Sequence, residues 1–153
     1  MHFSDIAFLT LPVVIGMGLP AIVNLITQKK KPVPCGKKPS IQPPGWVFAT
    51  AWSILYILLG IAGYYGWIES GRDISNVAIV LFLLLIVFLN AWWLIFSNIC
   101  ASFASFFTIV VLLIHTMITV SMFFAKGLNK SGWLVIPLAL WLAFASTLSY
   151  LSI

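Results

Sequence analysis

Two polar side chains, Asn90 and His115, lie inside long apolar runs, where hydrocarbon would exclude them. The run around His115 offers no carboxylate, cysteine or second histidine, so we predict a satisfied residue facing a helix bundle rather than a metal ligand or catalytic base. The Asn90 amide has two interpretations, a hydrogen bond between helices or a donor in a ligand pocket. No charged residue lies deep in any run, which argues against an ion pump or a proton-coupled transporter.

Aromatic side chains are the second candidate for chemistry, because the chain holds seven tryptophans. Trp52 and Tyr56 are one helical turn apart and share a face. If that face meets Trp93 and Trp141, the rings enclose an apolar cavity that suits a large planar ligand. The alternative is that the rings only fill space between helices. Three further tryptophans mark the ends of apolar runs, where interfacial anchoring is expected: Trp46, Trp67 and Trp133.

Membrane helices must position these side chains, because 62% of the residues are hydrophobic, 7% are charged and the mean hydropathy is +1.13. The sequence predicts an all-α membrane protein, a bundle of five transmembrane helices forming a single domain over residues 1–153. The first predicted span is interrupted by Pro12, Gly16, Gly18 and Pro20, and the polar turn before the last span covers 126–132. The predicted spans are 6–27, 44–67, 76–96, 103–124 and 133–152.

The loop over 28–43, with Pro44 after it, holds five prolines and is predicted to form a lid over a pocket. It also holds five of the eight basic residues of the chain, which places this loop and the C-terminus in the cytosol by the positive-inside rule. Lys37 and Lys38 either only orient the protein or also meet carboxylates of a ligand. Because the +5 charge comes mainly from one loop, no nucleic-acid partner is expected, and the two cysteines predict neither a disulfide framework nor a metal site.

Three ordered motifs resemble the translocator protein family, also called TspO/MBR or the peripheral-type benzodiazepine receptor. The first is the run from Lys38 to Ala49 with its continuation Trp52-Ser53-Ile54-Leu55-Tyr56 and Gly60. The second is Leu89-Asn90-Ala91-Trp92-Trp93 in the third span. The third begins at Trp133-Leu134-Val135-Ile136-Pro137 and continues through Leu140-Trp141, Phe144-Ala145, Thr147-Leu148 and Tyr150.

The resemblance implies a five-helix bundle, commonly a homodimer, in the mitochondrial outer membrane of a eukaryote or in a bacterial membrane. It implies porphyrin as ligand with no required cofactor, and in some members cholesterol or synthetic benzodiazepine-type ligands. Carried over position by position, the pocket residues are Pro43, Pro44, Trp52, Tyr56, Asn90, Trp93, Trp141, Ala145 and Leu148. Ile41 and Leu94 depart from the family pattern, so we expect a lid that closes less tightly or favours a different ligand. No basic residue follows Tyr150, which argues against sterol binding through the family's cholesterol-recognition pattern.

Three function classes follow from these residues. The first is a membrane binding or carrier protein for porphyrin or similar planar hydrophobic molecules, with transport of sterol or lipid as a wider possibility. The alternative is a light-dependent enzyme that degrades porphyrin with Trp52 and Trp141, although the pocket offers no general acid or base. The third is a scaffold that dimerises, with Gly16 and Gly18 as one packing face.

Overall fold

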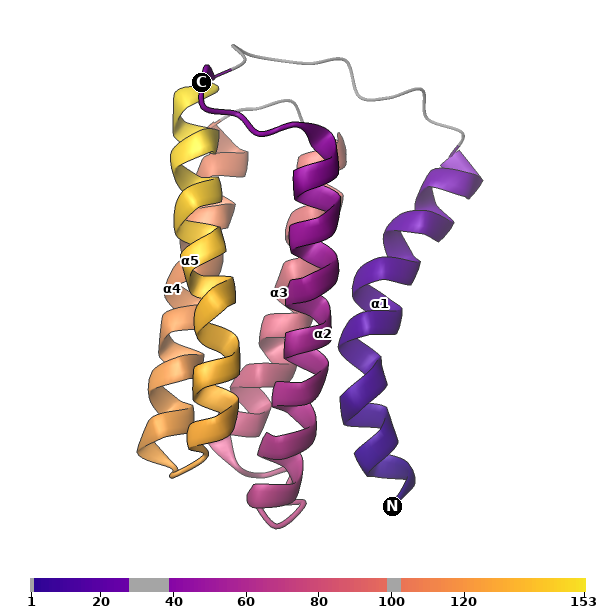
Figure 1. Cartoon of the computed structure of the whole chain (residues 1–153), viewed down its shortest axis with the longest axis vertical. Helices are drawn as coiled ribbons and strands as arrows, with labels where there is room; N and C mark the ends of the chain where they lie inside the picture. Colours follow the sequence, from indigo (N-terminus) through magenta and orange to yellow (C-terminus); the bar gives the residue numbers. More distant parts are fainter. Residues whose placement is uncertain (1, 28–38, 99–102) are drawn as a thin grey trace.

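Five α-helices make up the secondary structure of the computed structural model, which describes residues 2–27, 39–98 and 103–153 (Figure 1). The all-helical prediction is confirmed. The bounds agree with the predicted spans to within about four residues at each end, and they are α1 Phe3–Thr27, α2 Gly45–Glu69, α3 Val77–Asn98, α4 Phe103–Ala125 and α5 Asn129–Leu151.

The helices run up and down side by side, and the two chain ends lie at opposite ends of the bundle (Figure 1). Four helices contain stretches long and apolar enough to cross a membrane, α2 to α5, and the described part of α1 adds a shorter apolar stretch over Phe3–Leu19. Large apolar side chains such as Val87, Ile114 and Leu140 are exposed on the outside of the bundle, as lipid-facing residues are. The chain is a multi-pass membrane protein.

The residues predicted to interrupt the first span do not break α1, which is one continuous helix. Pro12 has no N–H to donate to the Phe8 carbonyl one turn earlier. That carbonyl oxygen packs against α2 instead, 2.9 Å from the position that a Cβ at Gly63 would occupy. The break in the helical ladder is therefore covered by a neighbouring helix, which is how membrane helices tolerate proline.

Glycines let α1 and α2 approach closely. A Cβ at Gly60 would overlap the Leu9 carbonyl oxygen, and a Cβ at Gly16 would overlap the ring of Tyr56. Gly16 is buried in this contact, whereas a Cβ at Gly18 would meet nothing. The C-terminal part of α1 leans away from the other helices (Figure 1), and its residues Ile22 and Leu25 are exposed. The predicted packing face for a partner is thus reduced, because Gly16 is already used within the chain.

The polar turn predicted over 126–132 is wrong in its second half. Gly127 has a φ of 74°, and Leu128 N–H closes α4 by donating to the Phe123 carbonyl at 2.8 Å. The helix α5 then starts at once, at Asn129. Tertiary contacts explain why turn-forming residues are helical here: Ser131 Oγ donates to the Ala62 carbonyl of α2 at 2.7 Å, and Gly132 gives room to the Phe124 ring.

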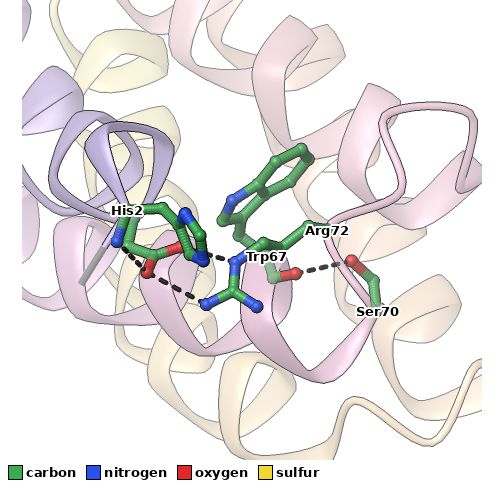
Figure 2. A network of polar contacts seen from close by, with 5 residues as sticks. His2, Trp67, Ser70 and Arg72 are labelled. Carbon is green, nitrogen blue, oxygen red and sulfur yellow. Dashed lines mark hydrogen bonds and ion pairs between the residues drawn. The ribbon is translucent and has the colours of Figure 1, made fainter.

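A polar network ties the start of α1 to the α2–α3 turn (Figure 2). The Arg72 guanidinium donates twice to the buried Asp5 carboxylate, at 2.9 and 3.0 Å, and the His2 backbone N–H donates to the same carboxylate at 2.9 Å. Arg72 is held in the left-handed region, with a φ of 61°, and its N–H donates to the Trp67 carbonyl. Beside this network Trp67 stacks on Phe8 of α1, with ring centroids 4.4 Å apart.

All three acidic residues of the chain lie at this end of the bundle, Asp5, Glu69 and Asp73. Lys130 pairs with Glu69 at 2.8 Å as Arg72 pairs with Asp5, so these two positive charges face nearby carboxylates. The chain between α1 and α2 has five lysines and no acidic residue. It joins α1 to α2 at the other end of the bundle, away from the three acidic residues. This charge separation agrees with the predicted cytosolic orientation of the lysine-rich loop, which stays a prediction.

The Asp5–Arg72 pair predicts acid sensitivity. The hydrogen bonds from Arg72 lower the pKa of the Asp5 carboxyl from 3.8 to about 2. Because the folded pKa lies below the unfolded one, the stabilisation is complete above about pH 4 and is lost as the pH falls toward 2. Unfolding midpoints of the detergent-solubilised protein, measured between pH 2 and 6, should decline in this window. The decline should be shallower in Asp5→Asn. The Asp73→Asn variant is the comparison: Ser75 lowers the pKa of the Asp73 carboxyl, so this variant shows how much of the decline comes from a second carboxyl. Equal pH profiles for the parent and Asp5→Asn would contradict the account.

Candidate functional site

Three tryptophans from three helices form a cluster in the bundle: Trp52 of α2, Trp92 of α3 and Trp141 of α5. The Trp52 ring centroid lies 5.8 Å from that of Trp92 and 6.5 Å from that of Trp141. The Trp52 and Trp141 rings meet edge to face at 85°, a favourable geometry for aromatic pairs. Each tryptophan lies within about 15 Å, along its helix, of the bundle end where the C-terminus lies. We call these three residues the tryptophan cluster.

Further aromatic rings extend the cluster along α2 and α5. Phe48, Trp52 and Tyr56 are spaced by four residues and therefore share one face of α2. Phe48 meets Trp141 edge to face at 5.6 Å, and Tyr56 lies 5.8 Å from Trp52. Phe144, one turn after Trp141, lies 5.6 Å from that ring. The predicted inward face of α2 with Trp52 and Tyr56 does meet Trp141.

The third-span partner of Trp52 is Trp92, whereas the sequence-based prediction named Trp93. No ring contact joins Trp93 to the cluster in the described part of the chain, where Trp93 is half-buried. Trp92 could have been found from its spacing, because Leu85, Leu89 and Trp92 are four and three residues apart and share a helix face. Leu85 and Leu89 are fully buried, and that face points into the core.

The Asn90 amide lies away from the Trp92 ring, because residues two apart point about 200° apart around a helix. Asn90 is buried, and its Nδ2 donates to the Ile86 carbonyl of its own helix at 2.7 Å. The Nδ2 hydrogen bond therefore stays within α3, whereas one of the two predictions was a bond between helices. His115 meets its prediction: it is half-buried and its Nε2 lies 3.0 Å from the Leu81 carbonyl of α3.

The other predicted pocket residues lie at the same end of the bundle as the cluster. Leu148 is buried, and Ala145 packs against the core. Pro43 and Pro44 directly precede α2, with Pro44 as its N-terminal cap residue. Lys37 and Lys38 lie outside the described residues.

A groove of about 420 Å³ lies between α2 and α5 next to the cluster. It opens on the outside of the bundle, and all of its lining residues are of apolar types. Trp141 belongs both to the groove and to the tryptophan cluster. The lining residues are Ala51, Ile54, Leu55 and Leu58 of α2 and Pro137, Leu140, Trp141 and Phe144 of α5.

The chemistry available at this site is ring contact, dispersion and hydrogen bonding. The Trp141 Nε1–H is buried and has no acceptor among the described residues. The described cluster and groove hold no carboxylate, histidine or lysine, and no group of three His, Cys, Asp or Glu suited to a metal occurs in the described part of the chain. Such a site suits a flat apolar molecule that carries a hydrogen-bond acceptor.

Apolar helices around an aromatic cluster, with an apolar groove beside it, define a polytopic membrane protein with a candidate site for a small hydrophobic molecule. Residues 8–152 match the TspO/MBR family, and the chain belongs to that family. Two relatives bear the name tryptophan-rich protein TspO. The protein of Archaeoglobus fulgidus is 31% identical over 115 residues, and that of Chlorobaculum tepidum is 32% identical over 117 residues. Each comparison covers 74% of this chain and 72% of the relative.

A third relative, protein CrtK of Rhodobacter capsulatus, is 27% identical over 115 residues, which is 74% of this chain and 71% of that protein. The family assignment made from the three sequence motifs is confirmed. Membership in this family is in keeping with a small hydrophobic ligand.

Proposed function

We propose that the protein binds a planar hydrophobic ligand of the porphyrin class at the tryptophan cluster and carries or stores it in the membrane. The observation that carries the proposal is the convergence of Trp52, Trp92 and Trp141 from three helices, beside an apolar groove. A flat aromatic macrocycle gains dispersion energy from such rings, and Trp141 Nε1–H provides one donor for it.

Titration of the purified protein with protoporphyrin tests this proposal. Saturable quenching of tryptophan fluorescence, together with a shift of the porphyrin absorption band, is the expected result. A sterol serves as the comparison ligand and should compete poorly, because its saturated rings have no aromatic face to stack on the indoles. Quenching that rises linearly without saturation would show partition into detergent and would overturn the proposal.

The Asn90→Leu variant separates the two roles of that amide. The Asn90 Nδ2 donates to a backbone carbonyl of the same helix, and that carbonyl also accepts the regular helical hydrogen bond. Loss of the amide should therefore change the unfolding free energy by less than about 1 kcal/mol. If Asn90 binds the ligand, porphyrin affinity should fall by about 1–3 kcal/mol. Fluorescence titration and thermal unfolding measure the two effects. Unchanged affinity with lowered stability would assign Asn90 to the fold.

The lysines of the first loop provide a prediction for charged ligands. If Lys37 and Lys38 meet the propionates of a porphyrin, changing both to glutamine should lower affinity and flatten its dependence on salt, at about 1 kcal/mol for each charge. Titrations at low and high salt measure this effect. A neutral apolar ligand is the control and should be indifferent to the change. Equal losses for both ligands would indicate a general disturbance of the loop.

A light-dependent enzyme is the second candidate, because the contact of Trp52 with both Trp92 and Trp141 joins three oxidisable rings. Illumination of the porphyrin complex distinguishes it from a carrier. Loss of porphyrin absorbance with a stoichiometric product, abolished by Trp141→Phe, would favour the enzyme. Unchanged porphyrin after illumination would favour binding and transfer.

A further inference from the structure

The groove between α2 and α5 connects the outside of the bundle to its interior. At its rim Ile54 is 53% exposed and Leu140 is 69% exposed, and both side chains face the lipid. At its inner side Leu55 is 6% exposed and belongs to the core. The lining residues lie well inside both helices, away from their ends. The groove therefore opens toward the hydrocarbon of the membrane rather than toward water.

Trp141 forms the boundary between the groove and the tryptophan cluster. One side of this residue lines the groove, and its ring also contacts Phe48 and Trp52. Its buried Nε1–H has no acceptor among the described residues, and an unpaired buried donor costs about 1–3 kcal/mol. Trp67 also has a buried Nε1–H without a described acceptor, but that ring is stacked on Phe8 and lines no groove. A molecule that moves from the groove past the Trp141 ring would provide the acceptor that Trp141 lacks.

Pro137 weakens α5 at the same place. It has no N–H, so the Trp133 carbonyl loses its donor within the helix, four residues before Pro137. Pro137 lines the groove and lies one turn before Trp141. A helix that lacks one rung of its hydrogen-bond ladder bends more readily. The α5 wall can therefore yield next to Trp141 at less cost than a regular helix.

We propose that the α2–α5 groove is a lateral portal, through which a planar apolar ligand with a hydrogen-bond acceptor passes from the membrane to the tryptophan cluster. Trp141 closes the inner end of the portal and meets the acceptor of the ligand with its Nε1–H. This inference rests on the proposed function, because it assigns the route to the same site. It predicts that ligand dissolved in the bilayer reaches the cluster without passing the loop over 28–43.

The Ala51→Phe variant tests the portal by narrowing it. Ala51 lines the groove and is outside the ring contacts of the cluster. Stopped-flow tryptophan quenching, with the protein in vesicles mixed with vesicles loaded with protoporphyrin, gives the association rate, and transfer to empty vesicles gives the dissociation rate. Both rates should fall by about tenfold or more while Kd stays within about twofold, because an access route changes both directions equally.

The matched control is Ala143→Phe, which adds the same side chain to an exposed site on α5 outside the groove. Its two rates should equal those of the parent. Leu140→Ala widens the rim of the groove, should raise both rates, and tests the portal even if Ala51→Phe does not fold.

Unchanged rates in both groove variants would overturn the portal while the proposed function stands. A faster dissociation with an unchanged association rate would also overturn it, since the groove would then be part of the bound site. Absence of saturable binding in the parent protein would overturn the proposed function and the portal together.

Discussion

Replacing Trp141 with alanine should weaken porphyrin binding by about 2 kcal/mol or more, which is roughly thirtyfold in Kd. Trp141 contacts Phe48, Trp52 and Phe144, and it also lines the groove. Its removal therefore takes away both a wall of the site and the one buried indole donor beside the groove. Fluorescence titration and absorption titration should give the same change.

Trp141→Phe divides this effect into two parts. Phenylalanine keeps most of the ring contact and lacks the N–H, which has no acceptor among the described residues. The unfolding free energy should then change little, while a ligand with an acceptor should lose about 1 kcal/mol of binding. A ligand without an acceptor should bind the phenylalanine variant as well as the parent. Full affinity in Trp141→Ala would move the site away from the tryptophan cluster.

Gly60→Ala should destabilise the bundle by about 1–3 kcal/mol, the usual range for overpacking. The added Cβ would overlap the Leu9 carbonyl oxygen, which is backbone and cannot rotate away. The overlap lies in the α1–α2 contact, one turn of α2 after Tyr56, so α1 should be displaced from α2. Thermal unfolding in detergent and protease sensitivity of α1 are the measurements.

Gly18→Ala is the matched control, since its Cβ would meet nothing within 4 Å. It should be neutral or stabilising by up to about 1 kcal/mol, because alanine favours helix more than glycine does. Equal losses of stability in the two variants would show that glycine acts on helix flexibility in general. Gly60→Ala with full stability would show that α1 adapts to the added methyl group.

The helix ends show how far pattern alone reaches. The predicted starts of α2 and α3, at 44 and 76, each differ by one residue from the structure, because Pro44 and Asn76 stand directly before apolar runs. The start of α5 was missed by one turn. Asn129, Ser131 and Gly132 have the composition of a turn, and tertiary contacts such as the bond from Ser131 to Ala62 and the contact of Gly132 with Phe124 make the helical form favourable.

At the candidate site, too, the sequence predicted one part of the arrangement and missed another. Trp52, Tyr56 and Trp141 were predicted to meet, and the structure brings Trp52 into contact with each of the other two. The choice between Trp92 and Trp93 depends on how α3 is rotated against α2. A rotation of about 100° exchanges the two neighbours, and an apolar run gives little information about it when every face is hydrophobic.

The sequence by itself determined the class of the protein, the number of helices and the family, because hydropathy, charge placement and motif order are properties of the linear chain. Only the tertiary structure decided which helix faces meet, the close approach of α1 to Gly60, and the groove between α2 and α5. The physical reason is that lipid and core are equally apolar. Helix rotation in a membrane is therefore set by close packing and a few hydrogen bonds between helices, which no hydrophobic pattern records.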